Sequence, residues 1–122
     1  MESYLNKLNV QGRMYILGIS GGFKEGYADS AVCLIKDNEI IAAAEEERFS
    51  RVKHSPSEMP INAIKFCLNQ AKISMKDVDK IAYPFTWPGA DKRVGDYIRF
   101  QFKSCPEIRL INHHIAHAAS TY

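Results

Sequence analysis

Three of the four histidines in this 122-residue chain lie close together in "INHHIAHAASTY", residues 111–122. If the segment is helical, His113 and His117 project from one face, with Cβ atoms about 5–6 Å apart. Two imidazoles at that spacing can bind one metal ion, each through a nitrogen at about 2.0–2.1 Å. His114 is turned about 100° away and cannot share the ion. The spacing therefore predicts a divalent-metal site, although surface or capping histidines at a helix start would show the same pattern.

Two imidazoles do not complete a metal site, which needs a third and a fourth ligand. The residues around His113 and His117 include no pair of aspartates. Asp29, in a glycine-rich loop much earlier in the chain, is a candidate carboxylate ligand. Nothing in the local sequence requires its side chain to point toward the histidines, so this third ligand stays a hypothesis.

A second charged cluster is "EEERFSRVKH", residues 45–54, in which three acids precede Arg48, Arg51, Lys53 and His54. Arginine binds phosphate and carboxylate groups through two parallel hydrogen bonds, so these cations are candidates for binding an anionic substrate. From composition alone, a solvated charged loop is the simpler explanation. Phe49 within the run indicates a folded segment.

Short apolar runs predict the elements that must position these residues. The first three predicted strands are joined by short connections, including a tight turn at Asp37-Asn38, so they form an antiparallel meander. Strands that then alternate with helices add parallel strands to the same sheet. Strands are predicted at residues 14–20, 30–36, 39–49, 78–85 and 107–112, and helices at residues 60–73 and 88–103, with another beginning in residues 111–122.

The predicted fold class is therefore α/β, a mixed sheet covered by helices. The order of elements is that of the ribonuclease H-like half-domain, with an antiparallel three-strand meander followed by parallel strands. Ferredoxin-like and other α/β arrangements share part of this order. Element order alone therefore leaves those alternatives open.

Composition narrows the function classes. A formal net charge of +2 without a basic stripe disfavours nucleic acid as a partner. No apolar run approaches the roughly 18 residues that span a bilayer, and no signal peptide is evident at the start, so we expect no membrane and a cytoplasmic location. Three cysteines at wide spacings fit reduced thiols. The glycine-rich loop lacks the GK[ST] of a nucleotide P-loop.

Two of these stretches together resemble the NodU/CmcH-type O-carbamoyltransferases. Residues 31–60, "AVCLIKDNEIIAAAEEERFSRVKHSPSEMP", resemble a strand-turn-strand unit that leads into that family's EEERF-x-R-x-KH signature. The C-terminal "INHHIAHAASTY" resembles its HHxxHAAS segment. The resemblance runs from about residue 15 to residue 122, and these motifs in this order are highly specific.

The resemblance implies an actin-like fold and transfer of a carbamoyl group from carbamoyl adenylate to an acceptor hydroxyl. A further domain of that family makes the adenylate from carbamoyl phosphate and ATP. An iron-like divalent ion would act in the transfer as a Lewis acid. By matching motif positions, the resemblance implies metal ligation by His113 and His117, catalysis by Asp29 and His114, and binding of the carbamoyl group or acceptor by Arg48, Arg51, Lys53 and His54.

One position departs from the family pattern. The family has a glycine-histidine-aspartate-alanine-serine loop after its first strand. Here the loop is longer and Ala28 stands where the histidine is expected, whereas Asp29 and Ser30 keep the remainder. If that histidine is catalytic, its loss puts activity in doubt.

The family enzymes are several times longer than this chain. Residues 1–122 are therefore expected to be the N-terminal subdomain of the carbamoyltransferase actin-like domain, with the remaining domains absent and the domain inactive alone. The missing C-terminal halves would act in trans. Two alternatives are an interaction module, which pairs with itself or another protein, and an unrelated metal-binding protein whose ligands are completed by another chain.

Overall fold

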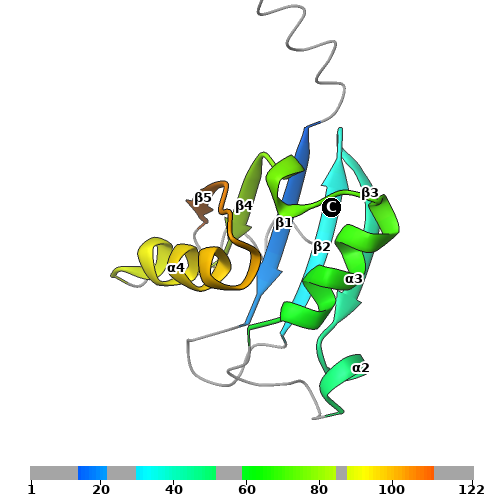
Figure 1. Ribbon diagram of the computed structural model, residues 1–122, viewed down its shortest axis with the longest axis horizontal. Helices are drawn as coiled ribbons and strands as arrows, with labels where there is room; N and C mark the ends of the chain where they lie inside the picture. Colours follow the sequence, from blue (N-terminus) through cyan, green and yellow to red (C-terminus); the bar gives the residue numbers. More distant parts are fainter. Residues whose placement is uncertain (1–13, 22–29, 52–58, 85–87, 112–122) are drawn as a thin grey trace, which may run out of the picture.

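The computed structural model describes residues 14–21, 30–51, 59–84 and 88–111, which form a sheet with helices packed on one face (Figure 1). The strands are β1 (Tyr15–Ser20), β2 (Ala31–Lys36), β3 (Glu39–Glu45), β4 (Lys80–Tyr83) and β5 (Glu107–Leu110). The helices are α2 (Glu47–Ser50), α3 (Ile61–Ala71) and α4 (Ala90–Phe102), with a single 3₁₀ turn, η1 (Met75–Asp77).

The strand order is β3-β2-β1-β4-β5. β1 pairs antiparallel with β2 and parallel with β4. β2 pairs antiparallel with β3, and β4 pairs parallel with β5. This is an antiparallel three-strand meander extended by two parallel strands. The prediction of an α/β ribonuclease H-like half-domain is therefore confirmed.

The connection between β2 and β3 is the tight turn predicted at Asp37-Asn38. Both residues have positive φ angles, 50° and 71°. A two-residue type I′ hairpin needs positive φ at both central positions, and Asp and Asn adopt this conformation more readily than most residues. The turn thus fixes the pairing of β2 with β3, which contains one irregularity between Leu34 and Ile35.

The core lies between the sheet and the helices. One row of side chains crosses the sheet through Leu34, Leu17, Ile81 and Ile108, which are neighbours in the register of four adjacent strands. The first three are fully buried. α3 packs over β2 and β3, and α4 packs over β5. The helices contribute to this core the buried side chains of Ala63, Ile64, Cys67, Leu68, Ala90, Val94 and Ile98.

α4 forms although Gly95 weakens its helix propensity. A Cβ atom at this position would lie 3.3 Å from Cδ1 of Ile108, so glycine lets the helix lie close to β5.

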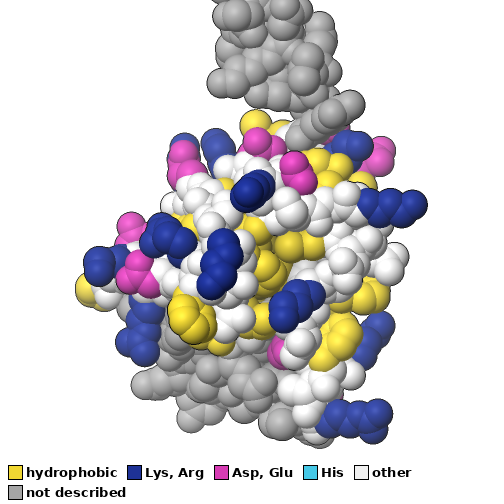
Figure 2. Space-filling view, in the orientation of Figure 1, with side chains coloured by type: hydrophobic (Ala, Val, Ile, Leu, Met, Phe, Trp, Pro, Cys, Tyr) yellow, Lys and Arg dark blue, Asp and Glu magenta, His cyan; other side chains and the backbone are white. Residues whose placement is uncertain are grey.

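Figure 2 shows hydrophobic side chains at the surface in the middle of the helix-covered face of the sheet, with lysines and arginines around them. Within the described ranges, no helix has the length and apolar character needed to cross a membrane.

Several predicted boundaries were too long, and one was wrong in kind. The strand predicted at residues 39–49 ends at Glu45, and residues 47–50 form α2 instead. The physical reason is that the carbonyl of Glu46 accepts hydrogen bonds from the N–H groups of Phe49 and Ser50, both at 2.9 Å. The helix predicted at residues 60–73 ends at Ala71, where Lys72 has a φ of 58°. The helix predicted in residues 111–122 lies outside the described residues.

Candidate functional site

Of the predicted site residues, Arg48 and Arg51 lie in the part of the chain that the structure describes. Arg48 belongs to α2, and Arg51 follows it as the C-cap, with a φ of 64° and its N–H bonded to the carbonyl of Glu47. Both side chains are exposed. The remaining candidates lie outside the described residues: Asp29, Lys53, His54, His113, His114 and His117.

The elements that lead to these residues all meet at one end of the sheet. Ser20 at the end of β1 is paired with Ala31, and Ala31 is paired with Glu45 at the end of β3. β4 and β5 run parallel to β1, and the N–H of Ile111 continues their ladder by donating to the carbonyl of Tyr83 at 2.8 Å. Open α/β sheets bind ligands beyond the carboxyl ends of their strands, so this end is the candidate site (Figure 1).

Glu46 connects three segments at this end of the sheet. Its side chain is buried, with 2% exposed. One carboxylate oxygen accepts a hydrogen bond from the N–H of Ala63 at 2.8 Å, and the other accepts one from Nδ2 of Asn62 at 2.8 Å. Its own N–H donates to the carbonyl of Ser30 at 2.8 Å. The carboxylate therefore serves as the N-terminal cap of α3, whose N-cap residue, Pro60, provides no side-chain cap.

This role of Glu46 was missed by the sequence reasoning. The acid lies 16 and 17 residues before its two partners, so no local spacing rule connects them. One signal was present in the sequence. A helix predicted to begin at proline, without Ser, Thr, Asp or Asn before it, needs a cap from elsewhere.

A ring contact also joins α2 to α3. The centroids of the Phe49 and Phe66 rings are 5.9 Å apart, with the rings tilted by 46°. Such tilted pairs stabilise beyond the area that they bury. Phe49 in the charged run therefore marks a folded segment, as the sequence predicted.

Tyr83 fixes the start of the glycine-rich loop. Its side chain is fully buried, and its hydroxyl donates to the carbonyl of Gly21 at 2.9 Å. Gly21 has a φ of 86°, a conformation that side-chain-bearing residues rarely adopt. The described residues on either side of the loop are thus held in place, Gly21 by Tyr83 and Ser30 by Glu46.

We expect Tyr83→Phe to lower the free energy of unfolding by about 1–2 kcal/mol, because the carbonyl of Gly21 loses a buried donor. Chemical denaturation measures the loss. Tyr15→Phe is the matched control, since the Tyr15 ring is only partly buried, beside the ammonium of Lys36. Equal stability of Tyr83→Phe and the wild type would contradict the importance of this hydrogen bond.

None of the three cysteines has the character of a nucleophile. Burial raises the pKa of Cys67 to about 11, with a smaller contribution from Cys33, and burial also raises the pKa of Cys33 and of Cys105. We expect Cys67 to react with iodoacetamide at pH 8 about a hundredfold more slowly than an ordinary thiol, because little thiolate is present. The rate should keep rising with pH beyond 9.

Mass spectrometry of alkylated peptides at several pH values would measure this, with Cys67→Ala to confirm the assignment. Rapid modification of Cys67 at pH 8 would show that the thiol is more acidic than its burial indicates.

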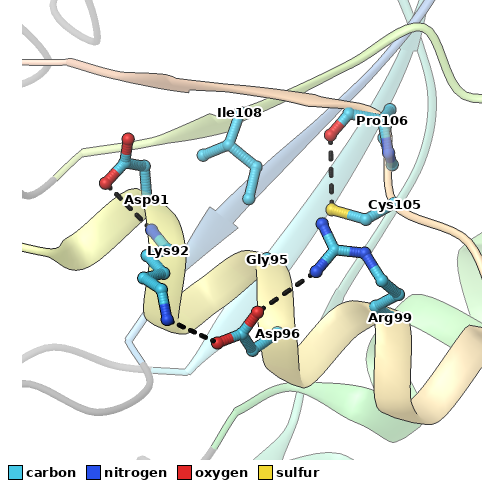
Figure 3. Close-up of a pocket in the computed structure, with 8 residues that line it drawn as sticks. All are labelled: Asp91, Lys92, Gly95, Asp96, Arg99, Cys105, Pro106 and Ile108. Atoms are coloured by element: carbon cyan, nitrogen blue, oxygen red, sulfur yellow. Dashed lines mark hydrogen bonds and ion pairs between the residues drawn. The ribbon is translucent and has the colours of Figure 1, made fainter.

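A hollow of about 390 Å³ lies between α4 and β5 (Figure 3). Its charged rim is internally paired: Asp96 lies 3.7 Å from Lys92 and 3.1 Å from Arg99. Ile108 and Pro106 line it from the strand side. Neither of the two described site residues, Arg48 and Arg51, lines this hollow, and its opposite charges largely cancel, so we do not take it as the candidate site.

The described residues thus define a class, an α/β half-domain that presents two arginines at the carboxyl end of its sheet. Residues 15–94 match the family described as Carbamoyltransferase N-terminus. The chain belongs to this family. The match includes α2 and the EEERF motif, so the resemblance inferred from the sequence is confirmed.

Curated relatives cover the same region. The chain is 49% identical over 69 residues to the uncharacterized protein sll1178 of Synechocystis sp., covering 57% of this chain and 10% of that protein. It is 38% identical over 81 residues to the nodulation protein NolNO of Sinorhizobium fredii, covering 57% of this chain and 12% of that protein. A 19.2 kDa uncharacterized protein of Rhizobium etli is also 38% identical over 81 residues, 47% of its length.

The chain therefore spans about a tenth of the length of the Synechocystis and Sinorhizobium relatives. Among solved structures, YeaZ from Pseudomonas aeruginosa matches 81% of this chain and 43% of its own, with 15% identity and a TM-score of 0.47.

Proposed function

We propose that this chain forms the N-terminal part of an enzyme that transfers a carbamoyl group from carbamoyl adenylate to an acceptor hydroxyl. The observation that carries the proposal is the family match over residues 15–94, which includes Arg48 and Arg51. The donor would be made elsewhere in the enzyme from carbamoyl phosphate and ATP. The rest of the enzyme would be supplied by segments or partners outside this chain.

The proposed work of Arg48 and Arg51 is to bind the negatively charged groups of the donor. During transfer, the acceptor hydroxyl loses its proton to a base, for which Asp29 and His114 are the proposed candidates. Its oxygen bonds to the carbamoyl carbon, and the bond from that carbon to the phosphate oxygen breaks, which releases AMP. Negative charge then grows on the carbamoyl oxygen and on the departing phosphate. Guanidinium groups held near those atoms would stabilise that charge. Lys53 and His54 follow directly in the chain and are proposed to act with them.

The proposed iron-like ion depends on His113 and His117. In the part of the chain that the structure describes, no three His, Cys, Asp or Glu side chains come together to hold a metal. When bound, the ion would supply Lewis-acid chemistry. Asp29 and His114 are proposed as catalytic residues beside it.

We expect His113→Ala and His117→Ala each to reduce the metal content of the assembled enzyme at least about tenfold, because two-point ligation by one histidine pair is lost. Elemental analysis of the purified enzyme measures the metal, and a carbamoyl-transfer assay measures turnover. His114→Ala is the control, since it should retain the metal while lowering turnover. Unchanged metal content in both ligand variants would overturn the metal assignment.

A second candidate function is a non-catalytic interaction module, favoured by the exposed edge of the sheet. β3 is an outer strand, and Ile40 and Ile41 on it are 70% and 39% exposed. Exposed apolar side chains on an edge strand invite pairing with another chain. A stable metal-free dimer in sedimentation experiments, together with absence of carbamoyl-adenylate binding, would favour this function over the enzyme.

A further inference from the structure

Glu46 has a geometry that suits positioning better than direct chemistry. Both oxygens of its buried carboxylate are occupied by donors of α3, at 2.8 Å each. Within the described residues, no cation forms an ion pair with it, and its neighbour Arg48 is exposed. A buried carboxylate whose two oxygens both accept hydrogen bonds from a helix end is poorly placed to exchange protons with a substrate.

The α2 segment, residues 46–51, depends on the rest of the fold for its position. α2 is a single turn of four residues with no buried residue. A helix of that length is unstable alone, so its position depends on its contacts. Among those contacts are the carbonyl of Glu46, which accepts from Phe49 and Ser50, and the ring pair of Phe49 with Phe66.

We propose that Glu46 is a positioning residue, which caps α3 through its carboxylate and thereby sets where Arg48 and Arg51 stand to bind a phosphate-bearing substrate. The phosphate ligand rests on the proposed function, whereas the positioning of α2 does not. Glu46 connects three segments, since the same residue forms hydrogen bonds with Ser30, α2 and α3. A shift of Glu46 would therefore displace the guanidinium groups of Arg48 and Arg51 together.

The test uses the 122-residue chain, titrated with inorganic phosphate and separately with carbamoyl phosphate, and followed by NMR at the amides of Arg48 and Arg51. We expect Glu46→Ala to weaken binding about tenfold, since preorganisation of the two cations is lost. Glu46→Gln should stay within about threefold of the wild type, because its amide oxygen still accepts from Ala63. Glu45→Gln, an exposed neighbour with the same charge change, should match the wild type.

Amide hydrogen exchange at Phe49 and Ser50 separates this inference from the proposed function. If the wild-type chain binds neither anion, the proposed role of the arginines fails. Faster exchange at these two amides in Glu46→Ala, but not in Glu45→Gln, would still support positioning. If Glu46→Ala does not fold, Asn62→Ala removes one donor at an exposed residue and should produce a smaller shift in the same direction.

Two results would overturn the proposal. One is unchanged binding and unchanged exchange in folded Glu46→Ala. The other is Glu46→Gln binding as weakly as Glu46→Ala while exchange at Phe49 and Ser50 stays slow, because the negative charge itself would then act on the substrate.

Discussion

Leu17→Ala is expected to lower the free energy of unfolding by about 3–4 kcal/mol, since it leaves a cavity in the centre of the sheet. Leu17 is fully buried on the central strand, β1, where its neighbours across the sheet are Leu34 and Ile81, both fully buried as well. Side chains on three paired strands cannot close around a missing isopropyl group without moving the backbone. Domains of this size have only about 5–15 kcal/mol of stability, so the loss is large.

Urea denaturation of Leu17→Ala measures this loss. Ile16→Ala is the matched control, because Ile16 is the preceding residue of β1 and points to the opposite face, where it is only partly buried. Ile16→Ala should lower the free energy of unfolding by less than half as much as Leu17→Ala. Equal losses for the two variants would contradict a core that lies on the helix side of the sheet.

Much of the fold was predictable because local rules and long-range packing agree. The apolar runs that become β1 and β2 are short and are followed by turn residues. Asp37 and Asn38 favour the hairpin conformation that the structure shows. A capping box at residues 74–77 likewise follows a local rule: the N–H of Ser74 is bonded to the carboxylate of Asp77 at 2.9 Å, and the box begins η1.

Predictions failed where a distant residue decides the local structure. The run after β3 has no turn signal, and a strand that continues to Phe49 is consistent with local sequence. The strand ends at Glu45, and the next residue begins α2 with its carbonyl while its carboxylate accepts from the N–H of Ala63 at the start of α3. Such a pairing depends on how α3 lies across the sheet. The periodicity of apolar residues along the chain does not show which residue of β3 or α2 lies next to the start of α3.

The sequence motifs identified the residues proposed to bind a ligand, but not the residues that hold them in place. Arg48 and Arg51 were identified from their charge and their place in the EEERF signature, and both are exposed where a ligand can reach them. The buried residues that support this end of the sheet, Glu46 and Tyr83, were not identified. A supporting residue is recognised by its contacts, whereas a ligand-binding residue is recognised by its own chemistry. The sequence displays only the second kind directly.

Glu46 connects the structural support of this end of the sheet with the two arginines proposed to bind the substrate. Three successive glutamates look equivalent in the sequence, yet the first is exposed on a strand edge and the second is buried beneath a helix. In this chain the EEERF stretch thus combines a structural carboxylate with cations that face outward. A substitution at Glu46 should therefore affect both stability and the arrangement of the arginines.

Glu46→Ala is expected to lower the free energy of unfolding by about 2–4 kcal/mol. Two hydrogen bonds to a charged acceptor are lost, and the N–H of Ala63 remains buried without its partner. The favourable interaction of the carboxylate with the positive end of α3 is lost too. Urea denaturation measures the change, and Glu45→Ala, at an exposed position of β3, should stay within about 0.5 kcal/mol of the wild type.

Glu46→Asp separates the charge from the hydrogen bonds. Aspartate keeps the negative charge near the start of α3 but is one methylene shorter, so it cannot hold both donors at 2.8 Å without a shift of the backbone. If the hydrogen bonds provide most of the stabilisation, Glu46→Asp should lose more than half of what Glu46→Ala loses, and added salt should change little, because the pair is buried. If Glu46→Asp instead has the free energy of unfolding of the wild type, and added salt lowers it, the stabilisation would come from the negative charge at the start of α3.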